Sequence, residues 1–362
     1  MIRKIRTDIK FAIIGTGVMA ATMMKTFSKA GIVVTAVVSR DAERAGQFAK
    51  AFAIPAGLAD LDSVLRRNDV DAVYIANAPQ EHAKTCIAAL EAGKAVLCEK
   101  PMALSEAEAQ RVVDTARRTQ TLCMEGLWTF FLPTYERVLE LSRTRQLGRI
   151  NSLIANFGYP IRYKAQSSLP GKDRGGVLLD RGIYLIALAL KVLGPVDRVD
   201  AHLNLSQFAV DEDAFLQMRH SDGTHSQLSA SFNSLMSNTA TLACVHGMIQ
   251  MEAPLIGSEA VSILRAPDTS ALGDPAQPLS FREKIKRKLS ENPQLRRLNQ
   301  MMKGSAFQHL PFGPDRYLPE LNHFVALLRA GAQESDIVPL DLSLEIQRII
   351  GLARADHARR LP

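Results

Sequence analysis

The feature that most restricts the fold of this 362-residue chain is a glycine turn near its start, Gly15-Thr16-Gly17-Val18-Met19-Ala20. The turn matches G-x-G-x-x-G/A and stands between a short apolar run, 10–14, and a stretch with helical periodicity, 18–30. In that setting the first glycine permits a tight turn, the second lets backbone approach a pyrophosphate, and the small third residue lets the helix pack closely. We therefore predict a dinucleotide site at Gly15, Thr16, Gly17, Val18 and Met19, with the phosphates at the helix N-terminus. The competing interpretation is a chance glycine turn before a helix.

The first third of the chain alternates strands and helices. Apolar strand patterns at 33–38, 72–76, 95–98 and 122–125 alternate with helical patterns at 42–52, 61–65, 80–92 and 105–119. This rhythm predicts a parallel, doubly wound sheet, so we expect an α/β Rossmann dinucleotide-binding domain over residues 1–125.

The rhythm changes after Gly126. Residues 196–264 have the pattern of several long strands with no helices between them, which predicts a mainly antiparallel sheet with one open face. We expect a substrate-binding and oligomerisation α+β domain over residues 126–362. An exposed sheet face of this size favours a homo-oligomer that covers it.

Composition limits the cellular setting. No apolar run approaches the roughly 20 residues needed to cross a bilayer, and the start of the chain is polar and basic. The four cysteines form no C-x-x-C pair, so we expect no metal site and no disulfide framework. These observations favour a reducing cytoplasm.

The net charge of +7 is concentrated in one segment, because residues 281–303 hold eight basic and two acidic side chains. The rest of the chain is almost neutral, which argues against nucleic-acid binding by its body. This segment lies in a basic insertion predicted over 268–314, where Phe281, Ile285 and Leu289 form an apolar stripe. Residues 280–303 fit a lid, a partner site or an anchor on an anionic membrane surface. They also fit a solvated helix that packs on the protein by its apolar stripe, and we favour this last interpretation.

The end of the second predicted strand bears on the choice of cofactor. NAD enzymes usually place an acidic residue there for the ribose 2′-hydroxyl, whereas this chain has Ser39 and Arg40. Serine leaves room and arginine offers a charged fork for a 2′-phosphate. We therefore prefer NADP(H) and keep NAD(H) as the alternative, while Asp41 is predicted to cap the next helix.

Two further groups have the residue types of acid–base chemistry. Lys100 follows a buried strand and precedes a proline, and lysine is seldom buried without a partner; the competing interpretation is a snorkelling surface lysine. Asp180 and Tyr184 share one face of a helix predicted over 179–193. Gly175-Gly176 before them is predicted to let backbone approach a ligand. The competing interpretation is a helix-capping aspartate and an interfacial tyrosine.

Together these segments resemble the Gfo/Idh/MocA-type oxidoreductases, in particular the dihydrodiol dehydrogenase and glucose–fructose oxidoreductase branch. The matching segments are collinear and cover most of the chain: GTGVMA from Gly15, the Ala78-Pro79 turn followed by His82, AGKAVLCEKP ending at Pro101, EGLW from Glu125, and GGVLLDRGIY ending at Tyr184.

The resemblance implies hydride transfer between a nicotinamide and a hydroxyl or carbonyl of a sugar, cyclitol or dihydrodiol. It implies that Lys100 faces the nicotinamide and holds the substrate oxygen, that Tyr184 exchanges the proton, and that Asp180 binds substrate hydroxyls or tunes Lys100. It also implies a lining for the nicotinamide ribose, formed with Lys100 by Asn77, Pro79, His82 and Glu99. His82 could equally cap its helix.

Two other functions fit the same features. One is an NAD(P)-dependent glycosidase that uses transient oxidation, and the other is a non-catalytic nicotinamide-binding regulatory protein. A regulator has no need of an acid–base set such as Lys100, Asp180 and Tyr184, so we favour an enzyme. Phe130 stands where many relatives carry arginine, which predicts a less cationic pocket or rim.

Overall fold

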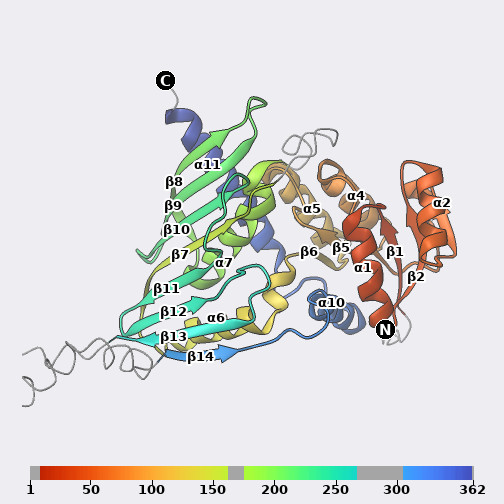
Figure 1. The fold of residues 1–362 in the computed structure, drawn as a ribbon. Helices are drawn as coiled ribbons and strands as arrows, with labels where there is room; N and C mark the ends of the chain where they lie inside the picture. Colours follow the sequence, from red (N-terminus) through yellow and green to blue (C-terminus); the bar gives the residue numbers. More distant parts are fainter. Residues whose placement is uncertain (1–8, 162–174, 267–304, 361–362) are drawn as a thin grey trace, which may run out of the picture.

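The computed structural model describes residues 9–161, 175–266 and 305–360, which form two sheets flanked by helices (Figure 1). The first sheet is entirely parallel, with the strand order β3-β2-β1-β4-β5-β6. Its strands are β1 (Lys10–Ile14), β2 (Val33–Val38), β3 (Ala56–Leu58), β4 (Ala72–Ile75), β5 (Ala95–Glu99) and β6 (Cys123–Gly126). The order reverses between β1 and β4, and ligands of doubly wound sheets bind at that point, at the carboxyl ends of the strands.

Helices connect these strands as predicted, and short polar signals set their ends. They are α1 (Val18–Lys29), α2 (Ala42–Ala51), α3 (Leu61–Leu65), α4 (Pro79–Glu91) and α5 (Glu106–Thr119). The Asp41 carboxylate accepts hydrogen bonds from the first turn of α2, which confirms its predicted capping role. Ser105 caps α5 in the same way, by accepting from the Glu108 backbone N–H at 3.3 Å. The doubly wound prediction is confirmed, although the short strand β3 was not expected.

The second sheet has eight strands in the order β14-β13-β12-β11-β7-β10-β9-β8. They are β7 (Ile150–Gly158), β8 (Val196–Leu205), β9 (Asp211–His220), β10 (His225–Ser231), β11 (Ala240–Cys244), β12 (Gly247–Met251), β13 (Ala260–Arg265) and β14 (Ser305–His309). Only the β7–β10 pair is parallel, so the predicted, mainly antiparallel sheet is confirmed.

One face of this sheet is covered and the other is open, as the alternation predicted. On β9, Ala214, Leu216 and Met218 are buried, while Phe215, between the first two, is 43% exposed. The covering helices are α6 (Pro133–Thr144), α7 (Ile183–Leu193) and α11 (Leu340–Arg360), which lie along the same side of the sheet (Figure 1).

Two predictions fall partly or wholly on residues that the structure does not describe. The basic insertion over 268–314 is described only from residue 305, where β14 adds an unpredicted edge strand to the second sheet. The proposed membrane-surface segment, 280–303, lies outside the described residues. Within the described ranges, no helix is long and apolar enough to cross a membrane.

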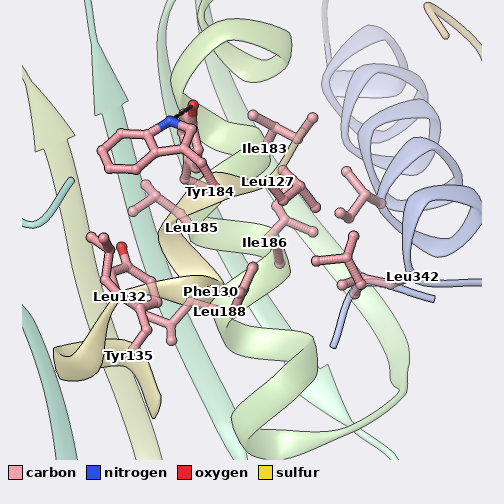
Figure 2. Packing of buried hydrophobic residues seen from close by; sticks show 14 of the residues in the cluster. Leu127, Phe130, Leu132, Tyr135, Ile183, Tyr184, Leu185, Ile186, Leu188 and Leu342 are labelled. Carbon is pink, nitrogen blue, oxygen red and sulfur yellow. Dashed lines mark hydrogen bonds between the residues drawn. The ribbon is translucent and has the colours of Figure 1, made fainter. Parts of the chain in front are cut away.

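The hydrophobic core holds Phe130, which was expected at the substrate pocket or its rim. The short 3-10 helix η1 (Trp128–Phe131) turns this side chain inward, beside Leu188 of α7 and Tyr135 of α6 (Figure 2). Phe130 is 2% exposed and meets Tyr135 edge-on at 5.5 Å between ring centroids. Phe130 therefore packs in the hydrophobic core and also lines a pocket, together with Phe131, Arg143 and Lys191. Its effect on the charge of a substrate pocket stays a prediction.

Two elements cross or bridge the proposed domain boundary at 125/126. β6 extends to Gly126, and helix α10 (Leu318–Ala330) from the far end of the chain packs beside α1 (Figure 1). The boundary itself stays a prediction.

Candidate active site

The two glycines of the turn differ in what makes them necessary. Gly15 has φ +115°, and a Cβ atom there would lie 2.4 Å from the Ala76 carbonyl oxygen, so the fold itself requires glycine. Gly17 has ordinary dihedral angles, and a Cβ on it would meet no atom within 4 Å. It begins α1 without any side-chain cap, and the next residue, Val18, is 83% exposed. Open space beside uncapped backbone N–H groups fits a pyrophosphate.

Ser39 and Arg40 lie beside this turn. The Gly15 backbone N–H donates to the Val38 carbonyl at 2.8 Å, which brings the end of β2 next to the glycines. Arg40 is exposed and has no hydrogen bond or ion pair with another described residue. Its guanidinium is therefore available to a phosphate at this edge of the sheet.

Lys100 lies at the carboxyl end of β5, before a cis Lys100-Pro101 peptide bond. Its Nζ donates to the Asp180 Oδ1 at 2.7 Å and to the Asp180 main-chain carbonyl at 2.9 Å. The side chains of Lys100 and Asp180 are 17% and 25% exposed. Lys100 is thus a partly buried, paired lysine rather than a snorkelling one, and β5 and the second domain meet through it.

Asp180 lies in a π-helical turn, η2 (Leu178–Gly182), that runs directly into α7. We expected an ordinary α-helix over 179–193. In the wider turn the Ile183 N–H bonds to the Leu178 carbonyl, and Lys100 reaches the Asp180 carbonyl. Single π-turns inside α-helices occur often at functional sites.

Arg181 holds this π-turn against the second sheet. The side chain is 7% exposed and donates to the Tyr159 carbonyl at 2.8 Å and to the Ser231 carbonyl. Its guanidinium also lies over the rings of Phe157 and Phe232, at 5.2 and 4.8 Å from their centroids. These contacts fix the residue next to Asp180, and they come from strands that are distant in sequence.

Tyr184 lies on the same side of the helix as Asp180, with Lys100 Nζ 5.3 Å from its ring centroid. Its hydroxyl accepts a hydrogen bond from Trp128 Nε1 at 3.0 Å (Figure 2). Burial raises the pKa of Tyr184 well above 10, and the negative charges of Glu99 and Asp180 raise it further. The hydroxyl therefore keeps its proton at neutral pH and can donate it.

Glu99 and His82 were predicted to line the nicotinamide ribose, and both side chains are almost completely buried. Glu99 accepts a hydrogen bond from the Tyr74 hydroxyl, and burial raises the pKa of Glu99. His82 Nδ1 lies 2.8 Å from the Pro101 carbonyl and its Nε2 lies 3.2 Å from the Asn77 carbonyl, and burial lowers the pKa of His82. In this position His82 does not cap its helix but ties α4 to the turn that carries Lys100.

Asn77 lies between β4 and α4, and Pro79 is the first residue of α4. The Asn77 Nδ2 group donates to Thr85 Oγ1 at 3.0 Å. Its Oδ1 atom is buried and lacks a hydrogen-bond partner in the described part of the chain. A buried acceptor without a donor is costly, so this atom fits a group that a bound cofactor would supply.

The prediction that Gly175-Gly176 admits a ligand is wrong, because side chains of the protein itself fill this space. Gly176 has φ +86°, and a Cβ on it would lie 2.3 Å from Asp211 Oδ1. Asp211 in turn accepts from the Leu178 N–H at 2.7 Å and from Arg354 at 3.1 Å. The glycines let Asp211 cap the helix that carries Asp180 and Tyr184.

Three side chains beside Tyr184 or Glu99 were not predicted as part of the site. Trp128, the only tryptophan, was noted within EGLW without a role, and its ring meets that of Tyr317 at 5.0 Å. Glu320 is 2% exposed, its Oε1 atom lacks a partner among the described residues, and burial raises its pKa strongly. Tyr317 and Glu320 begin α10, far from Trp128 in sequence, so no local pattern marked them.

Within the described residues, no three histidine, cysteine or acidic side chains form a metal-binding group. All four cysteines are free thiols.

Two family models match consecutive parts of the chain. The model described as "Oxidoreductase family, NAD-binding Rossmann fold" matches residues 9–127, and the model described as "GFO/IDH/MocA C-terminal domain" matches residues 135–250.

Known proteins match over most of the chain. Trans-1,2-dihydrobenzene-1,2-diol dehydrogenase of Mus musculus is 27% identical over 351 residues, which is 96% of each chain. The Sus scrofa enzyme of the same name is 30% identical over 251 residues, or 68% of this chain and 75% of the pig protein.

Solved structures share the fold. Levoglucosan dehydrogenase in complex with NADH superimposes with a TM-score of 0.81, at 17% identity and 98% coverage of both chains. KijD10, a 3-ketoreductase from Actinomadura kijaniata bound to TDP-benzene and NADP, gives a TM-score of 0.76 at 23% identity, with 97% and 98% coverage. From the matched domains and relatives, the chain belongs to the Gfo/Idh/MocA family of oxidoreductases, on the branch of the dihydrodiol dehydrogenases.

Proposed function

We propose that the protein is an NADP(H)-preferring oxidoreductase acting on a CH–OH group or the corresponding carbonyl of a sugar, cyclitol or dihydrodiol. The observation that carries the proposal is the convergence of Lys100, Asp180 and Tyr184 at one point, at the end of β5. The named substrates of the relatives, a dihydrodiol and levoglucosan, belong to the same chemical class. NAD(H) remains the alternative cofactor.

The nicotinamide, when bound, accepts or supplies the hydride. The uncapped backbone N–H groups at Gly17, Val18 and Met19 would hold its pyrophosphate. Ser39 and Arg40 would bind a 2′-phosphate, since the Arg40 guanidinium has no partner among the described residues.

Lys100 orients and stabilises the substrate oxygen in this proposal. An ammonium group has three N–H donors, and Asp180 occupies two of them, at 2.7 and 2.9 Å. The third is left for the substrate oxygen and would stabilise the negative charge that develops there as a carbonyl is reduced. Asp180 fixes the direction of that donor.

Tyr184 transfers the proton. Its raised pKa keeps the proton on the phenol until an alkoxide forms beside it. The Tyr184 hydroxyl oxygen accepts the hydrogen bond from the Trp128 N–H. The proton of the hydroxyl takes no part in this bond and can be donated to the substrate oxygen. In the oxidation direction the same proton path runs in reverse.

A screen of polyols, aldoses and dihydrodiols with NADP and NAD, followed by nicotinamide absorbance, tests the proposal. We expect turnover with NADP, and we expect Arg40→Ala to lower kcat/KM for NADP at least tenfold while changing that for NAD less than threefold. Glycoside cleavage without net NADPH would indicate the glycosidase instead. Cofactor binding without turnover of any class would indicate the regulatory protein.

We also propose that the enzyme is a cytoplasmic homo-oligomer joined through the open face of the second sheet. The exposed Phe215 and its neighbours on that face support this arrangement. Light scattering of the purified protein would give its mass, and a monomer would contradict it.

A further inference from the structure

We propose that Arg316 binds an oxyanion of the substrate, so that the preferred substrate is a sugar carrying a carboxylate or a phosphate. This inference rests on the proposed function and names its substrate class. Arg316 precedes α10 and is exposed, and its guanidinium carbon lies 5.6 Å from the centroid of the Trp128 ring system. It also lies 5.9 Å from the Tyr317 ring.

The position of Arg316 next to the acid–base groups follows from Trp128. The indole N–H of Trp128 bonds to the Tyr184 hydroxyl, while a face of the same indole carries the Arg316 guanidinium. One indole ring therefore separates a fixed positive charge from the proposed proton donor. A substrate whose reacting carbon lies at Tyr184 can place a charged substituent near Arg316.

The guanidinium is held in place but has no anionic partner. Asp315 next to it is occupied by Thr26 at 3.0 Å, Lys29 at 2.9 Å and the Tyr317 backbone N–H at 3.1 Å. These bonds hold Asp315 on α1 and tie the Tyr317 backbone to Asp315, so the residues on either side of Arg316 are joined to each other. No carboxylate or hydrogen-bond acceptor among the described residues meets the Arg316 guanidinium, so its N–H donors remain for a ligand.

Gly257 adds room on the same side. It has φ +91°, and a Cβ on it would lie 3.7 Å from Arg316 Nη1 and 3.8 Å from the Trp128 ring. A Cβ at this position would be in ordinary van der Waals contact with both groups, so Gly257 lies directly beside Arg316 and Trp128. An arginine fork that rests on aromatic rings, without a protein carboxylate, has the chemistry that binds carboxylate or phosphate oxygens in pairs.

The test compares Arg316→Gln with Arg329→Gln, a matched control at the other, exposed end of α10. The substrates are D-glucose, D-glucuronate and D-glucose 6-phosphate, with the corresponding galactose series, each assayed with NADP. We expect the wild type to prefer a charged member to its neutral parent at least tenfold in kcat/KM. Arg316→Gln should lower kcat/KM for that member 10- to 100-fold and change the neutral parent less than threefold, while Arg329→Gln changes neither. Comparison of the sugar acid with the sugar phosphate shows whether the site binds a carboxylate or a phosphate.

Calorimetric binding of the same sugars to the enzyme–NADPH complex gives a second readout that needs no turnover. We expect tighter binding of a charged sugar to the wild type and its loss in Arg316→Gln. Equal losses for charged and neutral sugars, or no preference for charge in the wild type, would overturn the inference and leave the proposed function standing. Failure of every sugar class to turn over would contradict the proposed function, and the binding data would still decide the role of Arg316.

Discussion

The ammonium group of Lys100 is bonded to Asp180 twice, through the carboxylate at 2.7 Å and through the main-chain carbonyl at 2.9 Å. The carbonyl that accepts the second bond belongs to the π-turn that leads into α7. Two bonds to one residue define the direction of the remaining N–H donor, because the three donors of an ammonium group are tetrahedrally arranged. A lysine fixed in this way is preorganised for charge that develops on a substrate oxygen.

Asp180→Asn tests the charged half of this pair. The carbonyl bond can remain, but the carboxylate that orients and balances Lys100 is lost, so we expect kcat to fall about 10- to 100-fold. NADPH binding, measured by fluorescence titration, should change less than threefold. Asp336→Asn, at an 87% exposed side chain, is the matched control. Wild-type kcat in Asp180→Asn would exclude an active role for this carboxylate.

Gly17→Ala separates cofactor contact from folding. A Cβ at Gly17 would meet no atom within 4 Å. The free energy of unfolding of the variant should therefore lie within about 0.5 kcal/mol of the wild-type value. We expect its KM for NADP to rise at least tenfold, since the added methyl group would stand where the pyrophosphate approaches. Gly15→Ala serves as the comparison. Its Cβ would lie 2.4 Å from the Ala76 oxygen, so we expect this variant to be strongly destabilised. An unchanged KM in Gly17→Ala would argue against a pyrophosphate at this turn.

Glu320 predicts a dependence of stability on pH. Burial raises its pKa in the folded state, so its contribution to stability is present below about pH 4.5 and is lost as pH rises through the raised value. Glu320→Gln removes the ionisable group and therefore the fall in stability that accompanies its ionisation. We expect the variant to gain, relative to the wild type, at least about 1.4 kcal/mol in unfolding free energy between pH 4.5 and pH 8, the equivalent of one pKa unit. Parallel stability curves for the two proteins from chemical denaturation at both pH values would disprove this.

Tyr184→Phe tests the proton donor. The variant keeps the ring beneath Lys100 but loses the hydroxyl, and we expect kcat to fall about 10²- to 10⁴-fold. The pKa of Tyr184 is raised well above 10, so Tyr184 should not titrate between pH 6 and pH 9. Any inflection of the wild-type kcat in that pH range should therefore persist in Tyr184→Phe. An inflection in that range lost only in this variant would mean that the phenol ionises there.

The sequence predicted those parts of the site that depend on neighbouring residues. The turn at Gly15, the cap at Asp41 and the position of Lys100 after a buried strand all follow from short-range patterns. The π-turn at Asp180 could not be predicted, because Arg181 is held by carbonyls of the second sheet, at Tyr159 and Ser231.

Two other features of the site were hidden for the same reason. The need for glycine at 176 comes from Asp211, which only the folded chain brings close, so the pattern was taken for a ligand site. Trp128 meets Arg316 and Tyr317 only because α10 packs against η1, far from it in sequence. Contacts between distant segments leave no periodicity in the sequence.

The most direct test of the account is the turnover of Lys100→Ala, measured alongside its binding of NADPH. The variant loses the donor to the substrate oxygen and leaves the turn at Gly15 intact. We predict that kcat falls about 10²- to 10⁴-fold, while the dissociation constant for NADPH changes less than threefold. Normal turnover in Lys100→Ala would contradict the mechanism at its centre.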